Sequence, residues 1–357
     1  MEKNFYDFEY EELKEYLTNH FHLDEKKSSM RANQIWKFVY KNGFVKLEKF
    51  LNISKELKEK VGNKIDFNRI TISEEKKSVD GTIKWLLKLK DNNLVEAVYI
   101  PFGKTGTLCI SSQVGCTLNC KFCHTGTQMM VRNLETSEIV QQLLIAKDRL
   151  ADWGSEKKIR NIVYMGMGEP FYNYSNVRKS INILNNISGL DYGPKRITVS
   201  TAGVAPQILQ AANEIKTCLA LSLHAPNDKI REKIMPINKK YKIADLISSC
   251  SNYAKVNNEK IFLEYVLLKD VNDMESCAKE LIKLMSKFPC KLNLIEFNVW
   301  PGVGYEPSDK KAVNNFFNLI KSSGHIVTLR KSKGEDILGA CGQLKTDSER
   351  KKKALIN

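Results

Sequence analysis

Three cysteines lie within eight residues in the segment VGCTLNCKFCHTGTQ, residues 114–128. A structural zinc site usually takes four ligands, often as two CxxC pairs, but the spacing here is CxxxCxxC and the chain has no second pair. His124 is a candidate fourth ligand, although its position next to Cys123 makes joint chelation awkward. A thioredoxin-type pair of Cys120 and Cys123 would leave Cys116 without a role.

Three thiolates also suit an iron–sulfur cluster that keeps one iron open. A [4Fe–4S] cluster is normally held by four thiolates. Binding by Cys116, Cys120 and Cys123 alone would leave the fourth iron free for another ligand. The spacing favours such a cluster, and the alternative from a different class is a zinc-stabilised RNA-binding protein.

The remaining cysteines do not suggest a disulfide framework. The chain has nine cysteines, an odd number scattered over 357 residues, as is typical of thiols kept reduced for metal binding or chemistry. Four of them lie inside strand or helix patterns and are predicted to be small buried apolar residues. They are Cys218, Cys250, Cys277 and Cys290.

From about residue 107 onward, predicted strands alternate with predicted helices. Seven strand-like runs begin near residues 107, 159, 196, 218, 261, 292 and 325, and helical patterns such as TSEIVQQLLIAKDRLAD separate most of them. This order predicts βα units around a parallel sheet. No GxGxxG follows the first strand, so we expect an α/β fold of the partial (β/α)6-type barrel over residues 101–345.

Polar and glycine-rich segments occur where the predicted strands end. The cysteine segment follows the first strand and GMGEP, residues 166–170, follows the second. Ser200 ends the third strand, the segment 222–224 ends the fourth, and Asn298 ends the sixth. Barrels of this kind place their chemistry at the carboxyl ends of the strands. We therefore expect one functional rim.

Two smaller regions precede the predicted barrel and a basic tail follows it. Residues 1–65 contain three amphipathic helical segments, the second with Ser28 or Ser29 as its N-cap, and form a candidate helical accessory domain. Residues 66–100 alternate apolar and polar residues around two turns, which predicts a small β meander that links the two domains. Residues 346–357 are predicted to be a solvated tail.

The net charge of +15 favours a polyanionic partner such as nucleic acid. Residues 1–65 carry 13 Lys and Arg against 11 Asp and Glu, so the excess lies in the remaining chain. An AT-rich genome, which encodes lysine frequently, explains the composition about equally well. The chain shows no membrane-length apolar run and no signal-peptide pattern at its start, so a cytoplasmic protein that does not enter a membrane is expected.

Longer sequence strings resemble one family. LCISSQVGCTLNCKFCHTGTQ, VYMGMGEP, ITVSTAG, ALSLHAPND with IREKIMPIN, and GACGQL together resemble the radical S-adenosylmethionine (SAM) enzymes that methylate an aromatic carbon of adenine in RNA. The similarity spans nearly the whole chain. It is greatest to the dual-specificity enzymes that form 2-methyladenosine in 23S ribosomal RNA and in transfer RNA. The alternative is the related C8-adenosine methyltransferases of 23S rRNA, which confer antibiotic resistance.

The resemblance implies two cofactors and the residues that bind them. Cys116, Cys120 and Cys123 would hold a [4Fe–4S] cluster whose open iron binds SAM. Gly168 and Glu169 would contact the amino group of SAM. The other implied SAM contacts are Ser200, Ser222, Leu223, His224 and Asn298.

The resemblance also implies a methyl carrier and two SAM molecules per turnover. One SAM methylates Cys341, and a second is cleaved to a radical that activates the methylated cysteine for addition to C2. Cys109 would release the product through a transient disulfide with Cys341, and Glu96 would accept the C2 proton. Without the family resemblance, Cys109 would be interpreted as a buried thiol in a strand, Glu96 as an exposed strand carboxylate and Cys341 as a thiol in the tail. Gly339 and Gly342 predict a mobile loop around Cys341.

The implied partners are 23S rRNA, tRNA and an electron donor such as flavodoxin or ferredoxin, and a monomer is expected. Reaching C2 requires an adenine that leaves its stack. The N-terminal domain is a candidate RNA-binding region because Arg31, Lys37 and Lys41 lie along one helical segment. Its nearly balanced charge is equally consistent with a structural role.

Overall fold

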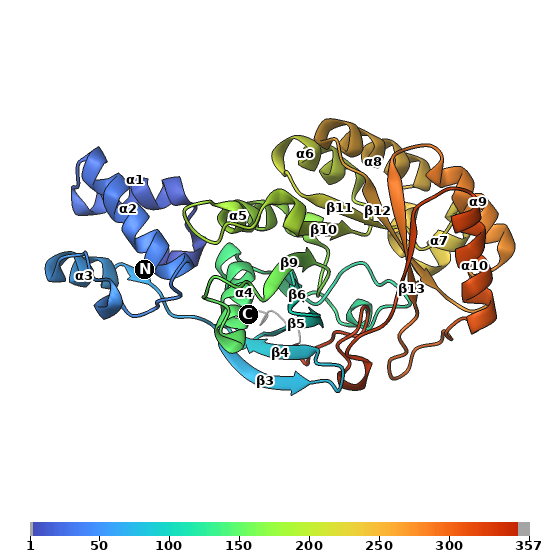
Figure 1. Ribbon diagram of the computed structural model, residues 1–357, viewed down its shortest axis with the longest axis horizontal. Coiled ribbons are helices and arrows are strands. Elements are labelled where there is room, and N and C mark those ends of the chain that lie inside the picture. Colours follow the sequence, from blue (N-terminus) through green and yellow to red (C-terminus); the bar gives the residue numbers. More distant parts are fainter. Residues whose placement is uncertain (1–2, 349–357) are drawn as a thin grey trace, which may run out of the picture.

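A helical region forms the start of the computed structural model, which describes residues 3–348. It contains α1 (Tyr10–Phe21), α2 (Glu25–Tyr40) and α3 (Lys55–Gly62), and β1 (Lys3–Asn4) pairs in parallel with β2 (Ile65–Asp66) to join its two ends. Its core is aromatic: Phe5, Tyr6, Trp36, Tyr40, Phe50 and Phe67 are all buried. Figure 1 shows these helices set to one side of the main sheet.

The predicted N-cap of the second helix was wrong. We expected Ser28 or Ser29, but α2 begins at Glu25, and the carboxylate of Asp24 accepts a 2.8 Å hydrogen bond from the Lys27 backbone N–H. A carboxylate at this position satisfies a free N–H and interacts favourably with the helix dipole. The helix therefore starts earlier, and Ser28 is buried within it.

One sheet of ten strands forms the body of the molecule. Its order is β14-β13-β12-β11-β10-β9-β6-β5-β4-β3. The antiparallel end consists of β3 (Thr71–Lys77), β4 (Ile83–Lys88) and β5 (Leu94–Phe102), and β5 pairs antiparallel with β6 (Thr105–Cys109). The predicted meander is thus continuous with the main sheet.

The other end of the sheet is parallel and confirms the predicted βα pattern. From β6 onward every pairing in this sheet is parallel. The strands are β9 (Ile159–Tyr164), β10 (Ile197–Thr201), β11 (Cys218–Ser222), β12 (Ile261–Leu267), β13 (Cys290–Glu296) and β14 (Val327–Arg330). They coincide with the strand-like runs expected from the sequence, and most of their apolar side chains are buried. The sheet is open, since β3 and β14 are its two edges.

Helices connect the parallel strands. Figure 1 shows α6, α8, α9 and α10 flanking the parallel end of the sheet. The connecting helices are α4 (Thr136–Leu150), α5 (Tyr174–Asn185), α6 (Ala205–Glu214), α7 (Asp228–Ile234), α8 (Ile243–Asn257), α9 (Glu275–Met285) and α10 (Lys310–Ser322). Each crossover returns the chain to the same edge of the sheet, so the carboxyl ends of the strands lie together.

The proposed domain limits at residues 65, 100 and 345 stay predictions. Most of the predicted tail, including RKKK at residues 350–353, lies outside the described residues. None of the described helices has the length and apolar character that crossing a membrane requires.

Candidate active site at the carboxyl ends of the parallel strands

A cavity of about 170 Å³ lies at the carboxyl ends of the parallel strands, where the sequence predicted a functional rim. Ten of the predicted site residues line it: Cys116, Cys120, Cys123, Gly168, Glu169, Ser200, Ser222, His224, Asn298 and Cys341. Leu223, Glu96 and Cys109 do not line it. The fold therefore collects most of the predicted residues in one place, from segments more than 200 positions apart.

The cysteine loop is closed at its base by a small antiparallel pair. β7 (Gln113–Val114) pairs with β8 (Arg132–Asn133), so the loop leaves and returns at the same point. Gly115 has a φ of 78°, and a Cβ there would lie 2.3 Å from the Met129 carbonyl oxygen. Glycine is required at this position by both conformation and space.

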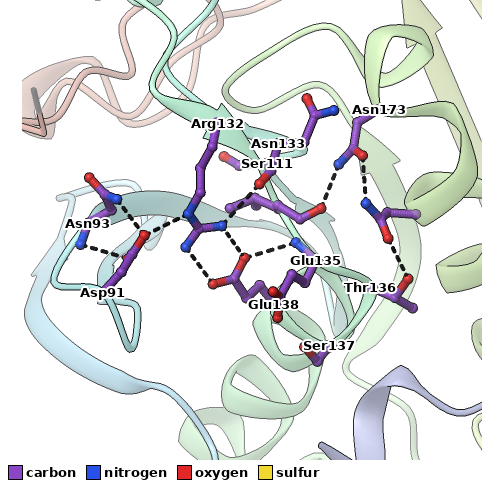
Figure 2. A network of polar contacts seen from close by, with 12 residues as sticks. Asp91, Asn93, Ser111, Arg132, Asn133, Glu135, Thr136, Ser137, Glu138 and Asn173 are labelled. Atoms are coloured by element: carbon purple, nitrogen blue, oxygen red, sulfur yellow. Dashed lines mark hydrogen bonds and ion pairs between the residues drawn. The ribbon is translucent and has the colours of Figure 1, made fainter. Parts of the chain in front are cut away.

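A polar network fixes this loop base to the body of the protein (Figure 2). The guanidinium of Arg132 donates to both oxygens of Glu138 at 2.7 and 2.8 Å and to Asp91 at 2.6 Å. Asn173 donates to the carbonyls of Ser112 and Leu134 at 2.8 and 2.7 Å. The loop is thereby held against helix α4 and the β4–β5 turn.

The three loop thiols lie around the cavity close enough to influence one another. Burial raises the pKa of Cys116 to about 12, and burial raises the pKa of Cys120 well above its usual value, with further contributions from the charges of Cys123 and Cys116. Thiolates at these positions therefore need a cationic partner to be stable.

This arrangement fits an iron–sulfur cluster better than a single metal ion. No three His, Cys, Asp or Glu side chains among residues 3–348 are placed to hold one ion, whereas tetrahedral zinc brings its sulfur ligands within about 4 Å of each other. Three thiols spread around one cavity suit a larger group with several iron atoms. Cys116, Cys120 and Cys123 are the residues that would hold it.

His124 faces the C-terminal segment. Its Nδ1 lies 3.2 Å from the carbonyl oxygen of Gln343, which can only accept, so Nδ1 carries the proton. Its ring stacks on Trp300 with 4.7 Å between centroids. The imidazole thus links the cysteine loop to the segment that contains Cys341.

Glu169 is buried at the wall of the cavity with both oxygens in use. One oxygen accepts a 2.7 Å hydrogen bond from the Ala202 backbone N–H and the other a 3.1 Å bond from Phe171. Burial raises the pKa of Glu169 to about 7. Gly168 before it has a φ of 94°, and a Cβ there would clash with Gln113 at 2.4 Å.

The remaining predicted cofactor residues differ in how they reach the cavity. His224 accepts a 3.0 Å bond from the Val266 N–H through Nδ1, and burial lowers its pKa to about 3, so its ring is neutral and Nε2 carries the proton. Leu223 is fully buried and its backbone N–H donates to the carbonyl of Glu264. Its carbonyl accepts a hydrogen bond from Arg231, so a contact of Leu223 with the cofactor stays a prediction.

Arg231 is a functional candidate that sequence reasoning missed. It is fully buried and donates to the carbonyls of Leu223, Ala202 and Ser222 at 3.0, 2.6 and 3.0 Å. It forms no ion pair with any described residue, and the charge of Cys120 acts on its pKa. The motif IREKIMPIN offered a signal, since an arginine on the inner face of a short helix needs buried partners. This guanidinium fixes the ends of β10 and β11 beside the cysteine loop.

The segment around Cys341 is irregular and is held from several sides. Lys84 donates to the Leu338 carbonyl at 3.0 Å, the His124 backbone N–H donates to Gly342 at 2.7 Å, and Asn298 donates to the Cys341 carbonyl at 3.1 Å. Cys341 is an exposed residue. Its thiol lies in the cavity, and the atoms that surround the thiol there raise its pKa. The predicted mobility of this loop stays a prediction.

Glu96 and Cys109 lie beside this segment. Glu96 is buried on β5, pairs with Lys84 at 2.8 Å and accepts a 2.9 Å bond from the Lys345 backbone N–H. Cys109 ends β6, and its pKa is raised by burial and by the charge of Cys341. The two predicted catalytic residues outside the cavity are thus neighbours of the Cys341 segment.

No disulfide joins Cys109 and Cys341, because all nine cysteines are free, so a disulfide bond between them is not supported as a resting feature of the protein. Of the four predicted structural cysteines, Cys250, Cys277 and Cys290 are buried as expected, and Cys218 is half-buried.

The N-terminal residues predicted to grip RNA differ in their surroundings. Arg31 donates to the Asn52 carbonyl at 2.6 Å and to Gln34, so its charge is engaged within the helical region. Lys37 and Lys41 are exposed. An RNA contact by this region stays a prediction that concerns these two lysines.

Two family models match the chain. Residues 110–283 match the Radical SAM superfamily, and residues 3–66 match the ribosomal RNA large subunit methyltransferase N-terminal domain. The first match includes the cysteine loop and the strands β9 to β12. The second covers the helical region at the start of the chain.

Named relatives agree with these matches. The chain is 47% identical to the dual-specificity RNA methyltransferase RlmN of Parvibaculum lavamentivorans, covering 92% of this chain and 86% of the relative. It is 46% identical to the RlmN of Chelativorans sp., covering 93% and 86%. The crystal structure of a radical SAM methyltransferase from Sphaerobacter thermophilus is similar at 35% identity with a TM-score of 0.89, covering 96% of this chain and 98% of that one. The chain therefore belongs to the RlmN family of dual-specificity RNA methyltransferases within the radical SAM superfamily.

Proposed function

We propose that this protein methylates C2 of adenosine in 23S rRNA and in tRNA, with Cys341 as the methyl carrier. The observation that carries the proposal is that Cys341 lines the same cavity as Cys116, Cys120 and Cys123. As a radical SAM enzyme, the protein has a [4Fe–4S] cluster and SAM as cofactors. C2 of adenine is an electron-poor amidine carbon, so direct attack on the SAM methyl group fails and a radical route is needed.

The cavity residues have distinct binding tasks in this proposal. When bound, the cluster supplies the electron that cleaves SAM to a radical. Cys116, Cys120 and Cys123 hold the cluster, and Glu169 accepts hydrogen bonds from the SAM amino group beside Gly168. The remaining contacts to SAM come from Ser200, Ser222, the Leu223 backbone, His224 and Asn298.

Three further residues handle the methyl group and the proton. Cys341 carries the methyl group, and Cys109 is the thiol whose attack on the Cys341 sulfur frees the product. Glu96 accepts the C2 proton, which is supported by its buried position between Lys84 and the Lys345 backbone. Burial raises the pKa of Glu96, which strengthens it as a proton acceptor.

The substrates and partners follow from this activity. The relatives are named for dual specificity toward RNA, and the net charge of +15 favours an RNA partner. We infer 23S rRNA and tRNA as substrates, a flavodoxin or ferredoxin as electron donor, a monomer, and a cytoplasmic location where both RNAs occur. The target adenine must leave its stack to reach the cavity.

Mass spectrometry of RNA nucleosides tests this function. Deleting the gene should remove 2-methyladenosine from 23S rRNA and tRNA, and the purified enzyme with SAM and a reductant should restore it. Retention of 2-methyladenosine in the deletion strain would contradict the proposal. Appearance of 8-methyladenosine as the product in vitro would assign the C8 reaction in its place.

A further inference from the structure

Glu264 is a carboxylate at the cavity that the proposed function leaves without a task. It lies in the middle of β12 and is 3% exposed. Its Oε1 accepts a 2.8 Å hydrogen bond from the Asn293 amide. Its Oε2 is buried and has no hydrogen-bond partner among the described residues. A buried carboxylate oxygen without a partner is costly, so its retention points to a ligand or a proton.

Cys341 is a neighbour of this carboxylate. Both residues line the cavity, together with Arg330 at the end of β14. The charges of Arg330 and Glu264 act on the Cys341 thiol in opposite directions, because Arg330 lowers the pKa of the thiol and Glu264 raises it. Arg330 is exposed and forms no ion pair with a described residue, so its charge is available to stabilise a thiolate at Cys341.

Other groups at the cavity are less suited to take a proton from Cys341. Among residues 3–348, Glu169 and Glu264 are the carboxylates that line the cavity, and both oxygens of Glu169 already accept backbone hydrogen bonds. His224 uses Nδ1 to accept from Val266, and its Nε2 carries the proton, so the neutral ring has no free acceptor. Of these two carboxylates in the described part of the chain, Glu264 is the one with an open oxygen.

We propose that Glu264 is the general base that removes the thiol proton of Cys341 in the first methyl transfer. The proposal rests on the proposed function, in which Cys341 carries the methyl group. Asn293 holds Oε1 and leaves Oε2 free for the proton. Arg330 stabilises the thiolate as it forms.

The step balances without an outside reductant. The S–H bond of Cys341 breaks and its proton moves to Oε2 of Glu264. The thiolate attacks the methyl carbon of SAM, a new S–CH₃ bond forms, and the bond from that carbon to the sulfonium breaks. The leaving group is neutral S-adenosylhomocysteine, and the proton on Glu264 later passes to solvent.

A base is needed because an ordinary thiol is mostly protonated at neutral pH. Its usual pKa is about 8.5, and burial raises the pKa of Cys341 further. Burial also raises the pKa of Glu264, while the charge of Arg330 and the hydrogen bond from Asn293 act in the opposite direction, and the net rise brings this carboxylate closer to the thiol in proton affinity. General bases of this kind contribute about 10²- to 10⁴-fold to a rate.

The test measures methylation of Cys341 without RNA and without reductant. The cluster is assembled in vitro on purified protein so that Cys341 starts unmethylated, and saturating methyl-labelled SAM is added. Peptide mass spectrometry follows the label on Cys341 over time in the unaltered protein, in Glu264→Gln, and in the matched control Glu296→Gln. Glu296 is on the neighbouring strand β13, opposite Leu267, and does not line the cavity.

Glu264→Gln should slow labelling of Cys341 by about 100-fold at pH 7, within the usual range for a general base. The deficit should shrink as pH rises toward 9, because solvent then takes the thiol proton. Iron content and SAM affinity should match the unaltered protein, and Glu296→Gln should label at the normal rate. Equal labelling rates for Glu264→Gln and the unaltered protein would overturn the proposal. A slower rate in Glu264→Gln that is fully explained by weaker SAM binding would overturn it as well.

The outcomes separate this inference from the proposed function. Failure of the unaltered protein to label Cys341 would count against the proposed function itself. Normal labelling there with undiminished labelling in Glu264→Gln removes only the base assignment. Should Glu264→Gln fail to assemble the cluster, Glu264→Asp decides: its carboxylate is one methylene shorter and lies farther from Cys341, so labelling at pH 7 should be slower than in the unaltered protein. A normal rate in Glu264→Asp at every pH would then overturn the assignment.

Discussion

The cysteine loop and the Cys341 segment face the same cavity but are built differently. The loop is closed by the β7–β8 pair, and its base is fixed by Arg132 and Asn173 (Figure 2). The Cys341 segment forms no strand, and individual side chains such as Lys84 and Asn298 hold its backbone. Its cysteine is exposed to the cavity, whereas the three loop thiols are more enclosed.

The difference matches two chemical tasks. A group that holds a cofactor benefits from a fixed geometry. A group that accepts a methyl from one molecule and passes it to another must meet both, and an irregular segment outside the sheet can place its side chain in the cavity for this purpose. The loop thiols are therefore expected to matter for cofactor content, and Cys341 for transfer alone.

Removing one thiol from each region should give the largest contrast. Both Cys120→Ala and Cys341→Ala should reduce RNA methylation below detection. Cys120→Ala should also lose iron and visible absorbance because a cluster ligand is missing, whereas Cys341→Ala should keep both. Iron analysis beside an RNA methylation assay measures this. Loss of iron in Cys341→Ala would break the comparison.

Cys109→Ala should stop the reaction after the methyl group has reached RNA. Without the partner thiol, the bond between Cys341 and the base persists, so a covalent protein–RNA complex should accumulate. A denaturing gel with labelled RNA detects it, and the double variant Cys109→Ala with Cys341→Ala should form none. Free methylated RNA released at the normal rate by Cys109→Ala would contradict the partner role.

Glu169→Gln should weaken SAM binding about 10- to 100-fold, because a hydrogen bond to a charged carboxylate contributes about 1.5–3 kcal/mol. The pKa of Glu169 is about 7 in the protein without ligand. The ionised form is the better acceptor, so SAM affinity of the unaltered protein should rise from pH 6 to 8. Calorimetry checks both. A Gln variant with the same pH dependence would show that another group titrates.

Arg132→Met should have the smallest effect on chemistry and a moderate one on stability. It leaves the buried Glu138 without its bidentate partner, at a cost of about 1–3 kcal/mol. The melting temperature should fall by several degrees, while Asp91→Ala, which removes the exposed partner, should lower it less. Thermal unfolding of both variants measures this, and equal shifts would argue against the buried pair as the main anchor.

Much of the fold and the rim could be predicted because its causes are local. Apolar runs mark the parallel strands, and the polar residues that follow them, such as Glu169 and Ser200, lie at one edge by topology. The start of α2 was misplaced because two serines and Asp24 compete as caps, and only the structure shows which one binds.

The missed residues depend on distances that spacing does not contain. Arg231 is buried against carbonyls at the ends of two different strands, β10 and β11, which no local pattern encodes. Glu264 did leave a signal, as the single carboxylate within the apolar strand IFLEYVL. Its open oxygen and its closeness to Cys341 required the assembled sheet.

A single-turnover isotope experiment tests the central claim that Cys341 carries the methyl group. The protein is first methylated with ¹³C-methyl SAM, freed of that SAM, and then given unlabelled SAM, reductant and substrate RNA. The first 2-methyladenosine formed should contain ¹³C, because its methyl carbon comes from Cys341. Unlabelled product in the first turnover would show that the methyl group reaches RNA without passing through this residue.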